Sequence, residues 1–360
     1  MMRIIAIHLL NDYSGSPKVL KQLLNIWQKN KINVHLFTAF GREGFLSGQK
    51  KITYHYFWYQ FYSNVILRFF SLFFSQFLLF FKLLFFLEKS DVVYVNTVLP
   101  FAAGFAGKLK GCKVIYHIHE TSMKPQILKK FLFGIVQLTA TEVVYVSHFL
   151  AKQEPLAVKH HILHNVLEND FVQLAENRKS REEKKQKNVL MICSLKAYKG
   201  VDVFVYLAQQ LHKFHFQLVV NASQAEIDRY FMNKNLPKNL KIYATQKVLH
   251  PLYNNASLVL NLSDTKLWVE TFGLTILEAM AYALPTIVPP IGGVTELVDD
   301  GMNGYLIDSK NTDEIIEKIN KILSNNVLYF DLSRAAYQKS LTFSEENFEK
   351  ESMKILINRS

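Results

Sequence analysis

Short apolar runs alternate with amphipathic stretches along the first half of this 360-residue chain. Residues 3–10, RIIAIHLL, indicate a buried strand, and the turn-rich loop NDYSGSP follows it. Residues 18–28 then carry apolar side chains at helical spacing, and INVHLFTAF indicates the next strand. This order of strand, loop, helix and strand is typical of a parallel α/β sheet.

The same rhythm returns after a highly charged stretch, RKSREEKKQK, at residues 178–187. Such a run of mixed charges indicates a solvated connector between two domains. We therefore predict a first α/β domain over residues 1–170, a charged linker over 171–187 and a second α/β domain over 188–342. Residues 343–360 are predicted to form a C-terminal helix. In open parallel sheets ligands bind beyond the carboxyl ends of the strands, so the loops after strands are the candidate sites.

One segment of the first domain is unusually aromatic. Residues 69–81, FFSLFFSQFLLFF, contain thirteen uncharged residues between Arg68 and Lys82. A helix that crosses a bilayer needs about 20 apolar residues, so we expect this stretch to be too short to span a membrane. It is either a core helix or an interfacial helix whose phenylalanines enter the membrane, with Arg68 and Lys82 at the headgroups. The number of phenylalanines favours the membrane contact.

The charge balance favours anionic partners. Lys and Arg outnumber Asp and Glu by 42 to 30, a formal net charge of +12. Phosphates, acidic lipid headgroups and nucleic acid would all suit that charge. No nucleic-acid-binding motif accompanies it, so no nucleic-acid partner is expected. Neither the two cysteines nor the scattered histidines have the spacing of a metal site. Nothing at the start resembles a signal peptide, so a cytoplasmic location is expected.

Residues 269–285, VETFGLTILEAMAYALP, carry two carboxylates eight residues apart in a pattern typical of a buried helix. Glu270 is predicted just outside the helix N-terminus, and Glu278 about 12 Å further along. Three backbone N–H groups would then form a seat for an anion, those of Phe272, Gly273 and Leu274. A buried carboxylate needs a partner, so Glu278 binds either a ribose diol or a cation of the core. The order of carboxylate, anion seat and carboxylate matches a sugar, a diphosphate and a ribose.

Residues 270–308, ETFGLTILEAMAYALPTIVPPIGGVTELVDDGMNGYLID, resemble the nucleotide-sugar signature of the retaining, GT-B-fold glycosyltransferases of family 4. The shared pattern is Glu, seven residues, Glu, followed by Ala-Met, Pro, Gly-Gly, Glu-Leu-Val and Asp-Gly. The resemblance implies two Rossmann-like domains facing a cleft. The first would bind the acceptor and the second the nucleotide sugar, and the C-terminal helix would return to the first domain.

Residues 193–200, CSLKAYKG, are similar to the family segment that closes on the diphosphate. Lys199 matches the phosphate-binding lysine of the family, which makes it a candidate catalytic residue together with Glu270. The family's usual Gly-Arg is replaced by Cys193 and Ser194, and Ser194 is expected to bind the nucleotide sugar. Lys196 is either a substitute for the missing arginine or a solvated loop charge. The substitution is not equivalent, because an ammonium cannot bind two phosphate oxygens in the bidentate geometry of a guanidinium.

Residues 117–121, HIHET, resemble the family loop in which a histidine lies beside the transferred sugar. His119 is the matching position and a candidate catalytic residue, with a satisfied core histidine as the alternative. We expect His117 to face the other side of the strand. Gly15, in SGSP, matches loosely the glycine loop that faces the diphosphate. Residues 221–223, NAS, depart from the Gly-x-Gly that is usual in the family.

The resemblance implies a retaining hexosyltransferase that stabilises the leaving diphosphate with Lys199 and the helix N-terminus. No metal is expected, because no Asp-x-Asp is present, and no cofactor besides the nucleotide-diphosphate sugar as co-substrate. The aromatic segment and the charge of +12 favour an acceptor at an anionic membrane. A lipid-linked saccharide in cell-surface polysaccharide or lipopolysaccharide synthesis would suit, with the enzyme peripheral at the inner face of the cell membrane.

Two other classes of function remain open at this point. The missing arginine and the altered residues 221–223 would also suit a catalytically degenerate, membrane-associated protein that binds a sugar nucleotide. A GT-B epimerase or phosphorylase is a further possibility, although no pyridoxal-binding lysine is recognisable. The nucleotide base, the sugar, the linkage and the oligomeric state are left undetermined by the sequence.

Overall fold

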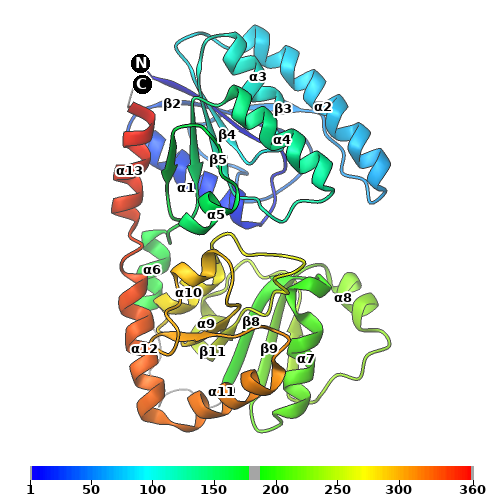
Figure 1. Ribbon diagram of the computed structural model, residues 1–360, viewed down its shortest axis with the longest axis vertical. Helices are drawn as coiled ribbons and strands as arrows, with labels where there is room; N and C mark the ends of the chain where they lie inside the picture. Colours follow the sequence, from blue (N-terminus) through cyan, green and yellow to red (C-terminus); the bar gives the residue numbers. More distant parts are fainter. Residues whose placement is uncertain (1, 178–186, 358–360) are drawn as a thin grey trace. The chain divides into compact units, whose positions relative to one another are not determined.

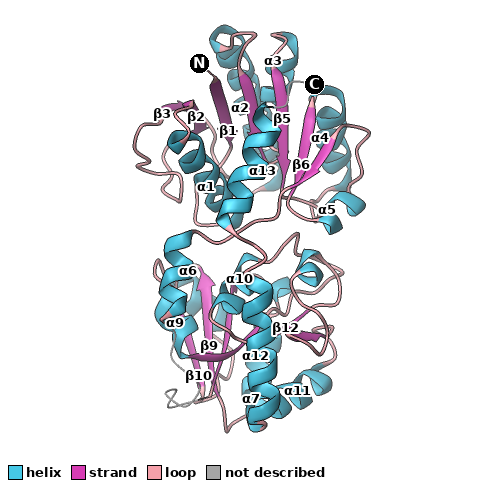
Figure 2. Cartoon of the chain, turned by 90° about the vertical axis from the view of Figure 1, so that its left-hand side faces the viewer, coloured by secondary structure: helices cyan, strands magenta, loops and turns pink. Residues whose placement is uncertain are grey.

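The computed structural model describes residues 2–177 and 187–357 (Figure 1). They form two compact units, the first comprising residues 2–165 and 346–357 and the second residues 166–177 and 187–345. Each unit is built on one parallel sheet with helices against it (Figure 2). The predicted α/β class is therefore confirmed for both units.

The sheet of the first unit has seven parallel strands in the order β3-β2-β1-β4-β5-β6-β7. Their bounds are β1 (Arg3–His8), β2 (Asn33–Ala39), β3 (Thr53–Phe57), β4 (Val92–Asn96), β5 (Lys113–Ile118), β6 (Glu142–Tyr145) and β7 (His160–Ile162). In register, Ile5 of β1 lies between His35 and Val93. The central strands are buried on both faces because helices cover the sheet on each side, which explains their continuous apolar runs.

The helices of this unit are α1 (Gly15–Lys29), α2 (Val65–Phe86), α3 (Ala102–Leu109), α4 (Gln126–Thr139), α5 (His148–Gln153) and α13 (Glu345–Ile357). On one face of the sheet α2 packs against α3, and α3 against α4. On the other face Trp27 of α1 meets the ring of Tyr94 edge-on, with 4.9 Å between the ring centroids. Both faces of the sheet are thus closed by apolar packing.

The C-terminal helix α13 belongs to the first unit. Glu349 pairs with Lys29 at 2.8 Å and accepts a hydrogen bond from Asn30 at 3.0 Å, so α13 lies along the end of α1. Further along, the Lys113 ammonium donates to the Ile355 carbonyl at 2.7 Å. The expected return of this helix to the first domain is confirmed for residues 346–357.

Helix α2 is longer than the sequence suggested. It runs for 22 residues from an N-cap at Asn64, whose side chain accepts from the N–H groups of Ile66 and Leu67. Among the described residues it is the one helix long and apolar enough to cross a membrane. We expected the apolar stretch to be too short to span a membrane. This expectation was wrong, because Arg68 and Lys82 lie inside the helix rather than at its ends.

The polarity of α2 is inverted with respect to an ordinary core helix. Its buried face carries the polar residues Ser71, Ser75 and Gln76 beside Leu72, Leu79 and Leu83. Its exposed face carries large apolar side chains, which include Phe69, Phe70, Phe74, Phe77, Phe81 and Phe85. This exposure contradicts the core-helix alternative, since a helix of the core would bury those rings.

The sheet of the second unit has six parallel strands in the order β10-β9-β8-β11-β12-β13. The strands are β8 (Asn188–Ser194), β9 (His215–Asn221), β10 (Leu240–Tyr243), β11 (Ala256–Leu260), β12 (Thr286–Val288) and β13 (Gly304–Leu306). The helices are α6 (Asn169–Glu176), α7 (Val201–Gln210), α8 (Gln224–Phe231), α9 (His250–Asn255), α10 (Leu274–Ala281), α11 (Thr312–Ser324) and α12 (Asn326–Ser340). Two short 3₁₀ turns, η1 (Ala197–Lys199) and η2 (Gly293–Glu296), complete it.

The predicted linker over residues 171–187 needs a correction at its start. Residues 169–176 form α6 within the second unit, and Phe171 anchors this helix. The Phe171 ring lies 4.5 Å from the ring of His250 and 5.9 Å from that of Tyr282, between centroids. The packing of Phe171 on these two rings therefore makes the start of the predicted linker part of the second unit. Residues 178–186, which carry most of the predicted charge, lie outside the described residues.

Candidate active site

The entrance of α10 is built by close backbone packing. Gly273 precedes the helix with φ +111°, and a Cβ there would meet Val294 Cγ1 at 2.6 Å. The N–H of Gly293 donates to the Glu270 carbonyl at 2.7 Å. Only glycine tolerates these approaches, so the glycines of the signature hold the segment before α10 against η2. The predicted seat at Phe272, Gly273 and Leu274 thus lies at a fixed helix N-terminus, where backbone N–H groups favour an anion.

Glu270 and Lys199 form an ion pair in front of this helix. The Lys199 ammonium contacts Glu270 Oε1, and the Ser263 hydroxyl donates to the same oxygen at 3.0 Å. Burial would raise the pKa of Glu270, but the charge of Lys199 and hydrogen bonds from Lys199, Ser263 and Asn261 outweigh it and lower the pKa. Glu270 is therefore held as a carboxylate, and a cation is held beside the anion seat.

An aromatic stack positions Lys199. The rings of Tyr198 and Trp268 are stacked with centroids 5.3 Å apart, and the Lys199 ammonium lies 4.7 Å from the centre of the Trp268 ring. The N–H of Asp264 donates to the Tyr198 carbonyl at 2.8 Å, which joins η1 to the loop after β11. We did not single out Trp268 or Ser263 from the sequence. Their signal was their place in a loop after a strand, where ligand-binding residues are expected.

Glu278 is buried within α10, where it is 2% exposed. The Tyr253 hydroxyl donates to Glu278 Oε2 at 2.6 Å. Burial, and then the charge of Glu278, raise the pKa of the Tyr253 hydroxyl well above its ordinary value, so the phenol stays protonated and keeps donating. A carboxylate has about four acceptor positions, and the Tyr253 hydroxyl takes one of them.

Ser194 ends β8 and Lys196 follows it, and both line a pocket of about 240 Å³ together with Asn221 at the end of β9. Ser194 pairs in register with Asn221, and Lys196 is exposed at the rim. Arg229 of α8 also lines this pocket, together with Glu226 and Tyr230. The arginine usual in the family is missing at Ser194, but Arg229 brings a guanidinium to the same pocket from α8. The sequence pattern did not indicate this role for Arg229.

In the first unit, His119 belongs to a cluster at the carboxyl ends of β1, β4 and β5. Its Nε2 lies 3.0 Å from Asn96 Oδ1, and the Asn96 amide lies 3.0 Å from His8 Nδ1. The ring of His117 lies 4.3 Å from that of His119, between centroids. The expectation that His117 faces the other side of the strand was wrong, because side chains two residues apart in a strand share a face.

The hydrogen-bond network fixes the tautomer of His119. The Asn96 amide N–H donates to the Ser16 carbonyl at 3.1 Å, so its Oδ1 is the atom that faces His119. Nε2 of His119 must then carry a hydrogen and donate it. Burial, followed by the neighbouring His117 and His8, lowers the pKa of His119 well below its ordinary value, so the ring is neutral. Nδ1 can therefore accept a hydrogen bond from a hydroxyl.

Gly15 lies at the start of α1, beside this cluster. The Asp12 carboxylate accepts from the Ser14 N–H at 2.8 Å, which orders the turn that precedes Gly15. The next residue, Ser16, is the one bound by Asn96. Asn96 therefore joins the Gly15 turn to His119, a role that no motif in the sequence indicated. Its signal was a polar residue at the end of an apolar strand.

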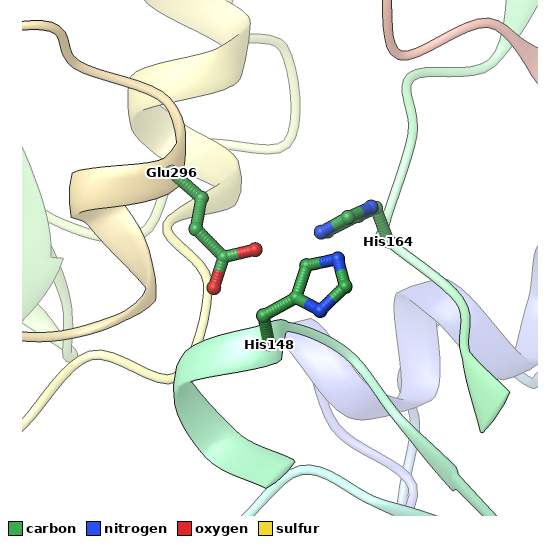
Figure 3. A group of neighbouring side chains, drawn as sticks. All are labelled: His148, His164 and Glu296. Atoms are coloured by element: carbon green, nitrogen blue, oxygen red, sulfur yellow. The ribbon is translucent and has the colours of Figure 1, made fainter. Parts of the chain in front are cut away.

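Two more histidines lie at the same edge of the sheet (Figure 3). His148 begins α5 after the N-cap Ser147, whose hydroxyl accepts from the Leu150 N–H at 3.1 Å. The ring of His164, which follows β7, lies 5.5 Å from the His148 ring, between centroids. Figure 3 also labels Glu296, a residue of η2 in the second unit. His148 and His164 thus join His8, His117 and His119 at the carboxyl edge of the sheet.

The buried histidines predict that the protein loses stability in acid. Burial lowers the pKa of His8, His117 and His119, to about 3 for His117. Below pH 6.5 these histidines bind protons in the unfolded chain but stay neutral in the folded chain. The free energy of unfolding therefore falls as the pH falls. At pH 5 the loss from His117 is about 2 kcal/mol. Glu120 acts in the opposite direction, since burial raises its pKa to about 7.

The measurement is urea unfolding at pH 7.5 and pH 5, for the wild type and for His117→Gln. We expect the variant to lose about 2 kcal/mol less than the wild type between the two pH values. His212→Gln, at an exposed histidine, is the matched control and should behave as the wild type. An equal pH dependence in wild type and His117→Gln would show that His117 is charged in the folded protein.

Comparisons with known proteins agree with this geometry. Residues 172–339 match the family described as Glycosyl transferases group 1, and residues 13–153 match Glycosyltransferase Family 4. N-acetyl-alpha-D-glucosaminyl L-malate synthase of Bacillus anthracis is 26% identical over 272 residues, which are 69% of this chain and 69% of that enzyme. A sucrose synthase of Melioribacter roseus is 40% identical over 74 residues, which are 19% of this chain and 9% of that enzyme's length.

The fold is shared with solved structures. The crystal structure of Anabaena Alr3699/HepE in complex with UDP and glucose superposes with a TM-score of 0.82 at 19% identity, over the full length of both chains. This likeness assigns the GT-B fold, with two Rossmann-like domains, to this chain. The family matches cover most of both units, including the segment around Glu270 and Lys199 and the strand that leads to His119. The chain is a member of the group 1, family 4 glycosyltransferases.

Proposed function

We propose that this protein is a retaining glycosyltransferase that moves a hexose from a nucleotide-diphosphate sugar to a saccharide acceptor. The observation that carries the proposal is the Lys199–Glu270 pair in front of α10, with Glu278 buried further along the same helix. HepE, which shares the fold, binds UDP and glucose, and this supports a nucleotide sugar as the co-substrate.

The proposed chemistry needs charge stabilisation at the leaving diphosphate. Lys199 supplies a cation and the N-terminus of α10 supplies backbone N–H groups, so we propose that the transfer requires neither a metal ion nor another cofactor. The Glu270 carboxylate, which stays ionised, accepts hydrogen bonds from sugar hydroxyls. In the first unit the neutral His119 can accept a hydrogen bond from a saccharide hydroxyl at Nδ1.

The acceptor is proposed to be a lipid-linked saccharide of cell-surface polysaccharide or lipopolysaccharide synthesis, reached at the inner face of the cell membrane. The exposed phenylalanines of α2 and the net charge of +12 support this part of the proposal. An apolar helix face and surplus cations together bind a protein peripherally to an anionic bilayer.

Thermal unfolding in the presence of UDP, GDP and ADP, and of their common sugar conjugates, tests the function. We expect one nucleoside diphosphate to raise Tm and its sugar conjugate to be consumed slowly with release of the diphosphate. At a ligand concentration 100 times Kd, the stabilisation is about 2.7 kcal/mol.

Stabilisation without any turnover would support the degenerate binding protein instead. Release of free sugar without an acceptor, together with a change at the sugar's other carbons, would indicate an epimerase. If no nucleotide stabilises a folded sample, the proposed nucleotide site is wrong.

A further inference from the structure

The first unit contains an apolar groove of about 860 Å³ between α2, α3 and α4, on the face of the sheet away from α1. We propose that this groove holds one acyl chain of a membrane phospholipid. The inference rests on the membrane contact in the proposed function, and it assigns a lipid site that is separate from the residues of the transfer reaction.

The groove is lined almost entirely by hydrocarbon. Phenylalanines and leucines of three helices form its walls, namely Phe73, Phe77, Phe80, Phe81, Phe101, Phe105, Leu109 and Leu138. Phe77 and Phe81 are 59% and 42% exposed, and both also belong to the outer face of α2. The groove therefore opens onto the surface that would meet the bilayer, and a lipid chain can enter it without crossing water.

Gln76 supplies one buried polar group in the lining. Its Oε1 accepts from the N–H of Ala102 at 3.1 Å, which fixes the orientation of the amide. Its Nε2 has no hydrogen-bond partner within the protein, and the residue is only 1% exposed. Because a buried donor without a partner is costly, the site is suited to a ligand with an acceptor, such as an ester carbonyl.

The chemistry of the lining selects a lipid over a peptide. Each residue of a peptide brings an N–H and a C=O that need partners once they are buried. The polar side chains of the lining are few: Gln76, Lys108 and Thr139. The Thr139 hydroxyl already donates to the Ile135 carbonyl, and the Lys108 ammonium contacts the Leu138 carbonyl. A hydrocarbon chain with one ester carbonyl needs few polar partners, and Lys108, which lines the groove, supplies a cation for the headgroup phosphate.

Photo-crosslinking tests the proposal on the full-length protein. The probe is phosphatidylcholine with a diazirine on one acyl chain, in vesicles of phosphatidylcholine and phosphatidylglycerol, with the labelled peptides identified by mass spectrometry. We expect label on α3 and α4, at the peptides of Phe105 and Leu138, in addition to α2. Leu138→Asp should reduce the label on α3 and α4 at least tenfold.

Ile127→Asp is the matched control, because Ile127 lies on the same helix, is more exposed than Leu138 and does not line the groove. It should leave the labelling of α3 and α4 unchanged. Leu138 is 57% exposed, so its replacement is compatible with folding, which an unchanged Tm would verify.

Three outcomes would overturn the proposal. Label confined to the outer face of α2 would mean that the helix rests on the bilayer and the groove holds no chain. Label on α3 and α4 from a diazirine-bearing polyprenyl phosphate, but not from the phospholipid, would assign the groove to an acceptor's tail. Failure to bind vesicles would exclude the lipid site and the membrane contact together. In that case, stabilisation by a nucleoside diphosphate would still report separately on the nucleotide-sugar site.

Discussion

Replacement of Lys199 by Met is expected to lower kcat by about 10²- to 10³-fold, because the variant lacks the cation that stabilises charge on the leaving diphosphate. The ammonium lies beside the N-terminus of α10, paired with Glu270 and held over the Trp268 ring. The rate of release of the nucleoside diphosphate from the sugar nucleotide that stabilises the protein measures the effect. A rate within threefold of the wild type would show that Lys199 does not act on the leaving group.

Loss of stability has to be separated from loss of chemistry in this experiment. Lys199→Met leaves the Glu270 carboxylate without its cation in a site that is only 20% exposed at Glu270, which costs up to about 3 kcal/mol. The double variant Lys199→Met/Glu270→Gln removes both charges, so it should recover Tm but not the rate. Lys234→Met is the matched control, because it breaks an ion pair with Asp202 that is exposed to solvent. It should leave both the rate and Tm unchanged.

The parts of the fold that sequence patterns predicted are those decided by local chemistry. Buried strands read as continuous apolar runs because both faces of each sheet are covered. The segment around Glu270 could be placed at a helix entrance because glycine, the apolar run and Pro285 define a helix by themselves. The α/β class and the start of α10 follow from such patterns without knowledge of the tertiary structure.

The errors arose where tertiary contacts decided the structure. The stretch from 171 was predicted to be linker, yet Phe171 packs on His250 and Tyr282, which lie about 80 to 110 residues later in the sequence. Arg68 and Lys82 were taken as the ends of an apolar segment. Lys82 fits within α2 because its ammonium reaches the Tyr56 carbonyl at 2.7 Å while its stem lies along the surface.

The candidate site shows the same division. Lys199 and Glu270 were each identified from a motif, but their pairing joins residues 71 positions apart and no local pattern predicts it. Trp268, Tyr253 and Asn96 carry no motif of their own, and each becomes informative only through the side chain it contacts. Positioning residues are therefore harder to find in a sequence than the charged groups they hold.

Replacement of Glu278 by Gln is expected to weaken binding of the nucleoside diphosphate that stabilises the protein by about 10- to 100-fold. Hydrogen bonds to a charged group contribute about 1.5–3 kcal/mol, and the amide gives up that charge while it keeps the shape of the side chain. The Tyr253 hydroxyl, which donates to Glu278 at 2.6 Å, can donate equally well to the amide oxygen. The helix should therefore remain intact, and isothermal titration calorimetry measures the change in Kd.

The 2′,3′-dideoxy analogue of the same nucleotide identifies the group that Glu278 binds. The wild type should bind the analogue about 10- to 100-fold more weakly than the parent, whereas Glu278→Gln should discriminate much less between them. Tyr253→Phe is the control, because it removes the hydrogen bond to Glu278 and keeps the carboxylate. It should lower Tm but preserve the discrimination. If Glu278→Gln discriminates as strongly as the wild type, the buried carboxylate serves the packing of α10, and the ribose is bound elsewhere in the second unit.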